Sequence, residues 1–379
     1  YSLFRQLMIY MSFSKTIGYL VSAVNVFEET KSLLTYQRSE ALLFISNELN
    51  RRRNEIAKTL SKESGKPLKY AFGEVTRAAS TFKVASEVIN TQGGEVMPLD
   101  ITPASGNRFG VIKRFPIGPI FGICPFNFPL NLVAHKVAPA IASGNPIIIK
   151  PASKVPLTAL ILADIFDKTK LPKETLQIIP CDRKTADEFI SDERIKMISF
   201  TGSVPVGNII TKSAGIKKVG LELGGNAATF IEKSADLAYA AARCAFGAFS
   251  NSGQVCISLQ RIYVQSEVYE EFSDLIAKET LKLKVGSCYE EETFMSALIN
   301  EEAATRAKHW IDAAVNEGAR LINGGEQNKN VITPAVLADV TDDMSIVCEE
   351  VFAPIVSLVK VDSFDEAVEK MNSSPYGLQ

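Results

Sequence analysis

The chain has 379 residues, of which 46% are hydrophobic and 22% charged, and its formal net charge is -2. This composition indicates a globular protein of about two or three domains. The near-neutral charge gives no electrostatic preference for nucleic acid or for an anionic membrane as partner. Two histidines are too few for a histidine-rich metal site, so no metal is predicted.

The six cysteines are widely scattered, and no pair has C-x-x-C spacing, which argues against a zinc or thioredoxin-type site. Reduced thiols in a cytoplasmic protein fit this pattern best. The apolar run Leu7–Met11 is too short to span a bilayer, and no convincing cleavage site follows it. The run is therefore predicted to be neither a membrane anchor nor an export signal.

Helical spacing of apolar residues predicts helices over 21–35, 36–64 and 70–90. Residues 93–118 then change character, because glycine, proline and aspartate interrupt a strand-like run, Arg108–Phe115. This pattern predicts a hairpin or flap.

From Pro119 onward, short apolar strands alternate with helices. Such strands are buried on both faces, which predicts a parallel sheet with helices on each side. The predicted strands are Ile120–Cys124, Ile147–Lys150, Leu176–Pro180, Met197–Thr201, Val219–Leu223 and Ala227–Ile231, with helices at 131–143, 157–169, 184–191 and 205–214. After Cys256 a second α/β unit is predicted, with strands Arg261–Gln265, Ile332–Val336 and Ile355–Val361 and helices at 266–283, 300–317 and 363–372.

Parallel sheets bind ligands beyond the carboxyl ends of their strands, and four loops there carry polar or glycine-rich residues. They are Pro125–Pro129, Lys150–Ser153, Gly202–Gly207 and Glu222–Gly225. The run Gly202–Gly207 opens a helix after a strand, where backbone amides suit a pyrophosphate. It lacks the established dinucleotide and P-loop fingerprints, so a plain strand-to-helix turn explains it equally well.

Three side chains could carry chemistry. Cys256 follows the turn-prone residues 249–255, where backbone amides could stabilise a thiolate nucleophile, although a buried free cysteine is the commoner fate. Asn127 could stabilise an oxyanion or simply cap the following helix. Glu222 ends an apolar strand, so it is expected to be partly buried and able to act as a general base, or else to be a surface charge.

Taken together, these motifs resemble the NAD(P)-dependent aldehyde dehydrogenase superfamily from about residue 22 to the end of the chain. The shared runs, in order, are Pro125-Phe-Asn-Phe-Pro129, Lys150-Pro-Ala, Phe200-Thr-Gly-Ser203 with Gly207, Leu221-Glu-Leu-Gly-Gly225, Asn251-x-Gly-Gln-x-Cys256 with Arg261, and Glu350-x-Phe352. Six ordered motifs are far more specific than any one of them.

The resemblance implies an enzyme that oxidises an aldehyde or semialdehyde to its carboxylic acid. Cys256 would form a thiohemiacetal and then a thioester, Asn127 with the amide of Cys256 would form the oxyanion hole, and Glu222 would activate the hydrolytic water. Because Glu222 is present, the resemblance favours hydrolysis of the thioester over transfer to coenzyme A, since coenzyme-A-acylating semialdehyde dehydrogenases often lack that carboxylate; such an acylating enzyme is the alternative. A non-catalytic fragment that retains the fold is another.

The resemblance also implies the cofactor contacts. Lys150 would contact the adenosine ribose, Gly202 and Ser203 the pyrophosphate, and Glu350 the nicotinamide ribose with Phe352 nearby. Gly207, Leu223 and Gly224 complete the implied cofactor set. Many members carry a glutamate where Ser153 stands, and a carboxylate there would repel a 2′-phosphate. Ser153, with Lys154 adjacent, therefore favours NADP, with NAD as the other candidate.

The implied fold class is α/β, with a Rossmann-like parallel-sheet cofactor domain, a second α/β catalytic domain and a small oligomerisation flap. The predicted boundaries are 1–97 and 117–224 for the cofactor domain, 98–116 for the hairpin and 225–379 for the catalytic domain. A homodimer or homotetramer is expected. Residues 1–19 do not resemble the family's first strand region, and family chains continue past Gln379, so the chain is expected to be a fragment.

Overall fold

The computed structural model describes residues 13–379, so the prediction for Leu7–Met11 lies outside the described residues. The chain forms two compact units. The first unit comprises the described residues up to Ala57 with Phe72–Thr201 and Pro205–Leu221, and the second comprises Lys58–Ala71, Gly202–Val204 and Glu222–Gln379. In the part of the chain that the structure describes, none of the helices combines the length and the apolar character that a membrane span requires.

Among the described residues, the helices before the first sheet are α2 (Phe13–Ser32), α3 (Thr35–Arg51), α4 (Arg53–Ser64) and α5 (Leu68–Val88). The single helix predicted over 36–64 is therefore wrong in one respect. It is interrupted at Arg52, whose backbone leaves helical geometry with φ -92° and ψ 13°. At this break the guanidinium of Arg52 donates hydrogen bonds to Glu55 in α4 and to Asp164 in α7. Arg52 therefore links the N-terminal helices to α7.

The sheet of the first unit has the strand order β5-β4-β3-β6-β7. Strand β3 runs parallel to β4 and β6, and β4 parallel to β5. Helix α6 packs on β3 and β4, α7 packs on β5, and the ring of Phe121 in β3 stacks on Phe189 in α8. The bounds are β3 Ile120–Ile123, β4 Ile147–Lys150, β5 Leu176–Ile178, β6 Met197–Thr201, β7 Lys218–Glu222, α6 Asn131–Ala142, α7 Leu157–Phe166, α8 Arg183–Ser191 and α9 Val204–Ser213.

Two expectations about this sheet need correction. The predicted strand Ala227–Ile231, β8, pairs with β9 in the other sheet, so the run of six strands divides after Glu222. Strand β7 is also not buried on both faces, because it is the edge strand and its terminal residues Lys218 and Glu222 are exposed.

The sheet of the second unit has the order β10-β13-β14-β9-β8. Its strands are parallel except β10, which is antiparallel to β13. Successive residues of β13 alternate between two apolar cores, with Val336 in one and Leu337 in the other. The bounds are β8 Ala227–Ile231, β9 Leu259–Gln265, β10 Arg320–Asn323, β13 Ala335–Ala338, β14 Ile355–Val361, α10 Leu237–Phe249, α11 Tyr269–Leu281, α12 Glu301–Asn316, α13 Ser345–Cys348 and α14 Phe364–Asn372.

The predicted strand Ile332–Val336 is in fact two strands. The short β12 (Val331–Ile332) pairs with β11 (Gln327–Asn328), and β13 begins only at Ala335. Pro334 lies between them, and a proline has no backbone N–H to continue a ladder. Strand β10 was not predicted at all.

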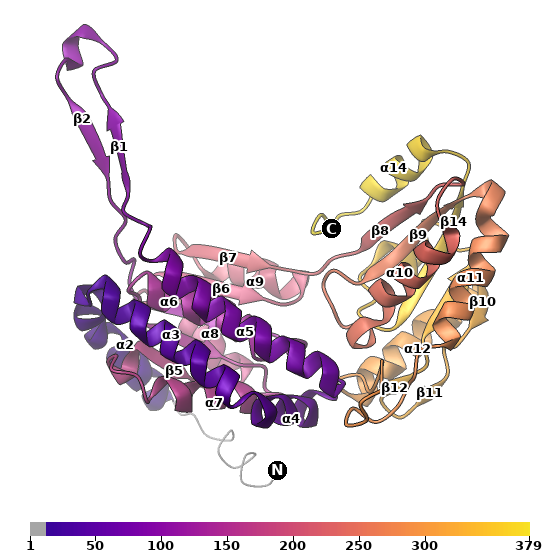
Figure 1. Ribbon diagram of the computed structural model, residues 1–379, viewed down its shortest axis with the longest axis horizontal. Helices are drawn as coiled ribbons and strands as arrows, with labels where there is room; N and C mark the ends of the chain where they lie inside the picture. The colour runs from indigo at the N-terminus through magenta and orange to yellow at the C-terminus, as the bar shows by residue number, and fades with distance from the viewer. Residues whose placement is uncertain (1–12) are drawn as a thin grey trace. The chain divides into compact units, whose positions relative to one another are not determined.

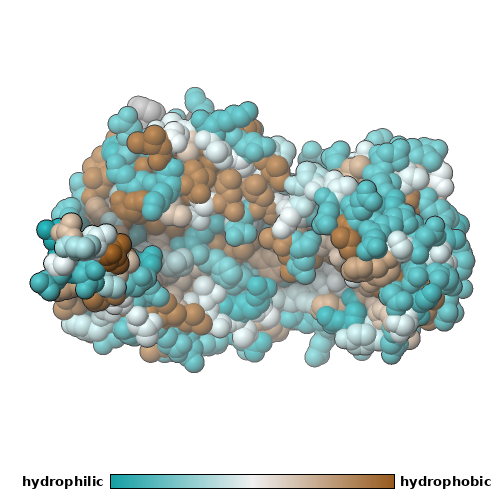
Figure 2. Space-filling model, turned by 90° about the horizontal axis from the view of Figure 1, so that it is seen from above, coloured by the Kyte–Doolittle hydropathy of each residue, from teal (hydrophilic) through white to brown (hydrophobic). Residues whose placement is uncertain are grey.

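A two-stranded hairpin projects from the first unit (Figure 1). Strands β1 (Glu95–Pro98) and β2 (Phe109–Ile112) pair antiparallel, with Glu95 opposite Ile112. Its apolar side chains are exposed, with Val96 at 73% and Phe109 at 71% of their full accessibility. Figure 2 looks onto the tip of the hairpin, where brown atoms lie among teal ones. An isolated hairpin of this kind is marginally stable, so these side chains form an unpartnered apolar surface in the single chain.

Candidate active site

Cys256 lies in a tight turn, residues 250–258, between α10 and β9. Three successive residues before it have left-handed backbone, with φ of 51° at Asn251, 57° at Ser252 and 68° at Gly253. Left-handed non-glycine residues cost on the order of 1–3 kcal/mol each and persist only where the surroundings fix them. Such strain is typical of functional turns.

Buried hydrogen bonds fix this turn. Ser252 Oγ donates to the carbonyl of Ser296 over 2.8 Å and accepts from the amide of Ser296 over 3.3 Å. Gln254 Oε1 accepts from the amide of Ile299 over 3.0 Å. A Cβ at Gly253 would overlap the carbonyl of Ala353, so only glycine fits there. Contacts with Ser296, Ile299 and Ala353 thus fix the conformation of the turn, and the Cys256 residue that follows is half-buried.

The surroundings of the thiol differ from the sequence expectation in one respect. Burial raises the pKa of the Cys256 thiol, and the charges of Glu350 and Glu222 raise it further. The backbone amides of Cys256 and Ile257 lower it, as the sequence predicted, but they do not outweigh burial. Burial and the neighbouring carboxylates therefore favour the thiol over the thiolate at Cys256.

Glu350 and the two glycines after Glu222 form a close contact. The amide of Gly225 donates to Glu350 Oε1 over 3.1 Å. A Cβ at Gly224 would overlap the Glu350 carboxylate, and a Cβ at Gly225 would overlap the carbonyl of Cys256. Burial raises the pKa of Glu350, while the Gly225 amide and the charge of Arg306 oppose that shift. Both glycines are thus required by close approach of their neighbours.

Sequence reasoning missed Gln260, which is only 2% exposed and joins two loops of this site. Its Nε2 donates to the carbonyl of Gly225 over 2.8 Å, and its Oε1 accepts from the amide of Val351 over 2.6 Å. The neighbouring Arg261 donates to the carbonyl of Asn226 from Nη2 over 2.9 Å and from Nε over 3.2 Å. The sequence did contain a signal for this role: Gln260 and Arg261 are two adjacent long polar residues inside the largely buried strand β9.

Glu222 ends β7 and is exposed, so the expectation of a partly buried carboxylate is wrong. The reason is the edge position of β7, which leaves one side of the strand uncovered. The carbonyl of Glu222 accepts from the amide of Gly202 over 3.0 Å. Its charge still contributes to raising the pKa of Cys256, which belongs to the same unit.

The remaining candidates follow the strand ends as predicted. Asn127, 6% exposed, lies in the bend between β3 and α6, and half-buried Lys150 is the last residue of β4. Exposed Ser153 lies in the turn before α7. Among the other predicted cofactor contacts, Gly202 and Ser203 directly precede α9, Gly207 lies in its first turn, and Leu223, Gly224 and Phe352 are half-buried.

The donor groups at these strand ends fit a dinucleotide. Lys150 and the hydroxyl of Ser203 suit ribose hydroxyls and phosphate oxygens. Helix α9 begins immediately after Ser203, and free amides of a helix N-terminus attract a pyrophosphate. The residues present therefore match the chemistry of NAD or NADP.

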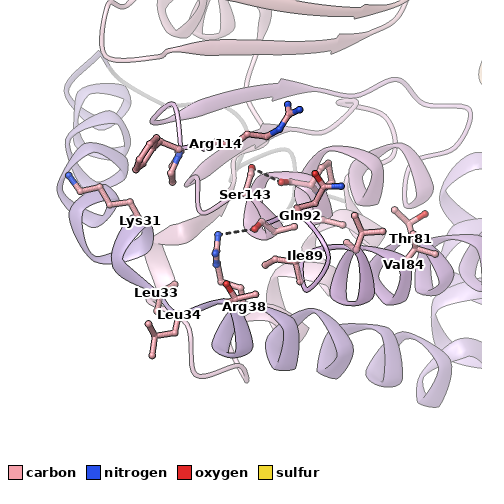
Figure 3. Close-up of a pocket in the computed structure, with 18 of the residues that line it drawn as sticks. Lys31, Leu33, Leu34, Arg38, Thr81, Val84, Ile89, Gln92, Arg114 and Ser143 are labelled. Carbon is pink, nitrogen blue, oxygen red and sulfur yellow. Dashed lines mark hydrogen bonds between the residues drawn. The ribbon is translucent and has the colours of Figure 1, made fainter. Parts of the chain in front are cut away.

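A separate cavity of about 940 Å³ lies near the base of the hairpin in the first unit. Figure 3 shows Arg38 in its wall, donating to the carbonyl of Ala142 over 2.8 Å. Leu34, Val84 and Arg114 also line it, whereas the residues predicted for the active site do not. This cavity is thus distinct from the strand ends.

Parallel sheets with polar loops at their carboxyl ends are typical of nucleotide-dependent enzymes, and a half-buried cysteine in a strained turn is typical of enzymes that use a covalent intermediate. The aldehyde dehydrogenase family model matches residues 17–379. The chain therefore belongs to the aldehyde dehydrogenase family and catalyses the NAD- or NADP-dependent oxidation of an aldehyde to its carboxylic acid. The predicted fold class, enzyme class and cofactor pair are confirmed.

Individual relatives agree with this assignment. The chain is 40% identical to the 3-sulfolactaldehyde dehydrogenase of Priestia aryabhattai, over 91% of this chain and 72% of the relative. It is 37% identical to the lactaldehyde dehydrogenase of Methanococcus aeolicus, over 96% and 81%. Aldehyde dehydrogenase 21 of Physcomitrella patens, solved with the reaction product succinate, superposes with a TM-score of 0.94 at 43% identity, over 97% of this chain and 77% of that one.

A further structure carries a cofactor. The glyceraldehyde-3-phosphate dehydrogenase of Methanocaldococcus jannaschii, complexed with NADP, superposes with a TM-score of 0.93 at 35% identity, over 98% of this chain and 81% of that one. Bound NADP in such a neighbour agrees with the donor set described above.

Proposed function

We propose that Cys256 is the nucleophile, Asn127 the oxyanion donor and Glu222 the general base of this oxidation. The observation that carries the proposal is the strained turn that presents the half-buried Cys256 thiol beside the charges of Glu222 and Glu350. A turn held in left-handed geometry by buried bonds gives a nucleophile one orientation.

The chemistry follows from these groups. The Cys256 thiol loses its proton to a base, and its sulfur bonds to the aldehyde carbon, which gives a thiohemiacetal on Cys256. The side-chain amide of Asn127 and the backbone amide of Cys256 donate to the oxygen that gains charge, a role for which preorganised donors are effective. A bound nicotinamide supplies the hydride acceptor, and loss of hydride leaves a thioester on Cys256.

Glu222 then takes a proton from water, and the resulting hydroxide attacks the thioester carbon. The carbon–sulfur bond breaks, so the acid leaves and the Cys256 thiolate is restored. Exposure of Glu222 suits this role, because the base must reach solvent water and release its proton afterwards.

The cofactor is proposed to bind through Lys150 at the end of β4, Gly202 and Ser203 before α9, and Gly207 in α9, with Glu350, Phe352, Leu223 and Gly224 at the nicotinamide end. This keeps the predicted domain roles, with cofactor binding over 1–97 and 117–224 and catalysis over 225–379. NADP is favoured, because exposed Ser153 and Lys154 present no carboxylate to a 2′-phosphate.

The substrate is proposed to be a small, oxygen-rich aldehyde such as a 2-hydroxyaldehyde or a semialdehyde. Support comes from the names of similar proteins, which include 3-sulfolactaldehyde and lactaldehyde dehydrogenases and a structure with succinate. A homo-oligomer joined through the apolar hairpin over 98–116 and a cytoplasmic location, where all six cysteines stay reduced, complete the proposal.

Product analysis with and without coenzyme A tests the function. The proposal expects free acid as the main product under both conditions. Acyl-coenzyme A as the main product would instead establish the acylating alternative. Stoichiometric iodoacetamide labelling is the companion measurement: Cys256 is expected to react ahead of the other five cysteines, and equal labelling without aldehyde-dependent cofactor reduction would leave only a non-catalytic protein.

A further inference from the structure

The loop that carries Asn127 is anchored by a carboxylate from a different helix. Glu74 lies on α5 and is only 2% exposed. Its Oε1 accepts hydrogen bonds from the backbone amides of Leu130, over 2.9 Å, and Asn131, over 3.1 Å. A buried glutamate is uncommon, because desolvation of the charge is costly unless hydrogen bonds compensate it.

These two amides belong to the start of α6, where backbone N–H groups have no partner within the helix. Leu130 occupies the N-cap position and makes no side-chain capping bond of its own. Glu74 therefore supplies the missing acceptor from a separate helix. A carboxylate at this end of a helix is also favoured by the helix dipole.

Asn127 lies only three residues before Leu130, and little freedom separates them. Pro129 fixes one backbone angle, and the carbonyl of Phe128 accepts the amide of Leu132 over 3.0 Å. The start of α6 thus sets the position of the Asn127 side-chain amide. A shift of that start would move the amide by a comparable amount.

Helix α5 contacts the same loop a second time. The guanidinium carbon of Arg77, one turn after Glu74, lies 5.9 Å from the ring centroid of Phe128. A cation above an aromatic face is attractive at this distance. Two side chains of α5 therefore restrain the residues that follow Asn127 directly.

We infer that Glu74 is a positioning residue that holds the amide of Asn127 in the geometry required to stabilise the oxyanion. The inference rests on the proposed role of Asn127. It adds to that role a residue more than fifty positions earlier in the chain, which touches neither substrate nor cofactor. Arg77 assists through Phe128.

A double-mutant cycle of Glu74→Gln and Asn127→Ala tests the inference. Asn127→Ala should lower kcat by about 10²–10³, the usual cost of removing an oxyanion donor. Glu74→Gln keeps the shape but weakens both bonds by removing the charge, and should lower kcat by about tenfold with the KM for aldehyde and the cofactor affinity unchanged. In the Asn127→Ala background, Glu74→Gln should change kcat by less than about twofold.

The matched control is Glu87→Gln, also on α5 but exposed and 3.8 Å from Lys83, which should leave kcat unchanged. If Asn127→Ala leaves kcat intact, the proposed oxyanion role itself is wrong. If Asn127→Ala lowers kcat but Glu74→Gln has no effect, or an effect that adds fully in the double variant, the positioning role is overturned.

A purely structural Glu74 would change thermal stability and cofactor affinity without this non-additivity. Should Glu74→Gln fail to fold, Arg77→Ala runs the same cycle, because Arg77 is exposed and can be truncated without opening the core. Arg77→Ala alone should lower kcat by a smaller factor than Glu74→Gln, and this loss should disappear in the Asn127→Ala background. If the effects of Arg77→Ala and Asn127→Ala on kcat are fully additive, the inference is overturned.

Discussion

The backbone amide of Gly225 donates a 3.1 Å hydrogen bond to the carboxylate of Glu350, across 125 positions of sequence. This contact, together with Gln260 between Gly225 and Val351, joins the loop after β7 to the loop before β14. It fixes the carboxylate proposed to contact the nicotinamide ribose.

Gly224→Ala should displace Glu350, because the added methyl group overlaps its carboxylate. Overpacking of this kind costs on the order of 1–3 kcal/mol of stability, and the moved carboxylate should weaken NADP binding by about tenfold, equivalent to ~1.4 kcal/mol. Fluorescence titration with NADP measures the affinity. Gly220→Ala is the control, since its Cβ would meet Met197 at an ordinary 3.4 Å, and equal losses in both variants would contradict the account.

Alkylation of Cys256 should depend on pH in a defined direction. Burial and the negative charges of Glu350 and Glu222 raise the pKa of the thiol, so thiolate and reactivity should appear above the pH expected for a free cysteine. Glu350→Gln removes one of those charges and should move the profile to lower pH. The iodoacetamide rate at Cys256 against pH measures this. A profile that moves to higher pH in Glu350→Gln is the opposite result.

Ser252→Ala should destabilise the protein, because it leaves the carbonyl and the amide of Ser296 without their buried partner while keeping the left-handed backbone. The expected loss is ~1–3 kcal/mol in the free energy of unfolding, read from urea denaturation. Ser373→Ala, which removes an exposed hydroxyl that donates to the carbonyl of Lys370, should change the free energy of unfolding by less than about 0.5 kcal/mol.

The apolar hairpin should mediate self-association. Phe109→Asp places a charge on its exposed apolar surface and should reduce the mass of the assembly in light scattering, without lowering helix content in circular dichroism. Ile216→Asp alters another fully exposed apolar side chain, outside the hairpin, and should leave the mass unchanged. A Phe109→Asp protein of unchanged mass would remove the hairpin from the interface.

Much of the fold was predictable, because short apolar strands such as Ile147–Lys150 and Ile355–Val361 are buried on both faces and are bounded by turn residues. The antiparallel strand β10 was missed, since its residues are largely exposed and lack a continuous apolar run. Assignment of Ala227–Ile231 to the second sheet depends on pairing with β9, which is a tertiary relation.

The candidate site, like the fold, was predicted from the sequence only in part. Motif order identified Cys256, Asn127 and Glu222 as candidates, but the exposure of Glu222 follows from the edge position of β7 rather than from its local sequence. Glu74 and Gln260 were not predicted, because their partners lie 56 and 35 or more positions away and are mostly backbone atoms. Backbone acceptors and donors leave no residue-specific signature.

The central claim, a thioester on Cys256 resolved by Glu222, is tested most directly by trapping that thioester. Glu222→Gln keeps the side-chain shape but cannot take a proton from water. After incubation with aldehyde and NADP, intact-mass and peptide analysis should show one acyl group per chain, attached to Cys256, while the unaltered enzyme shows none. An acyl group on another residue, or full turnover by Glu222→Gln, would contradict the account.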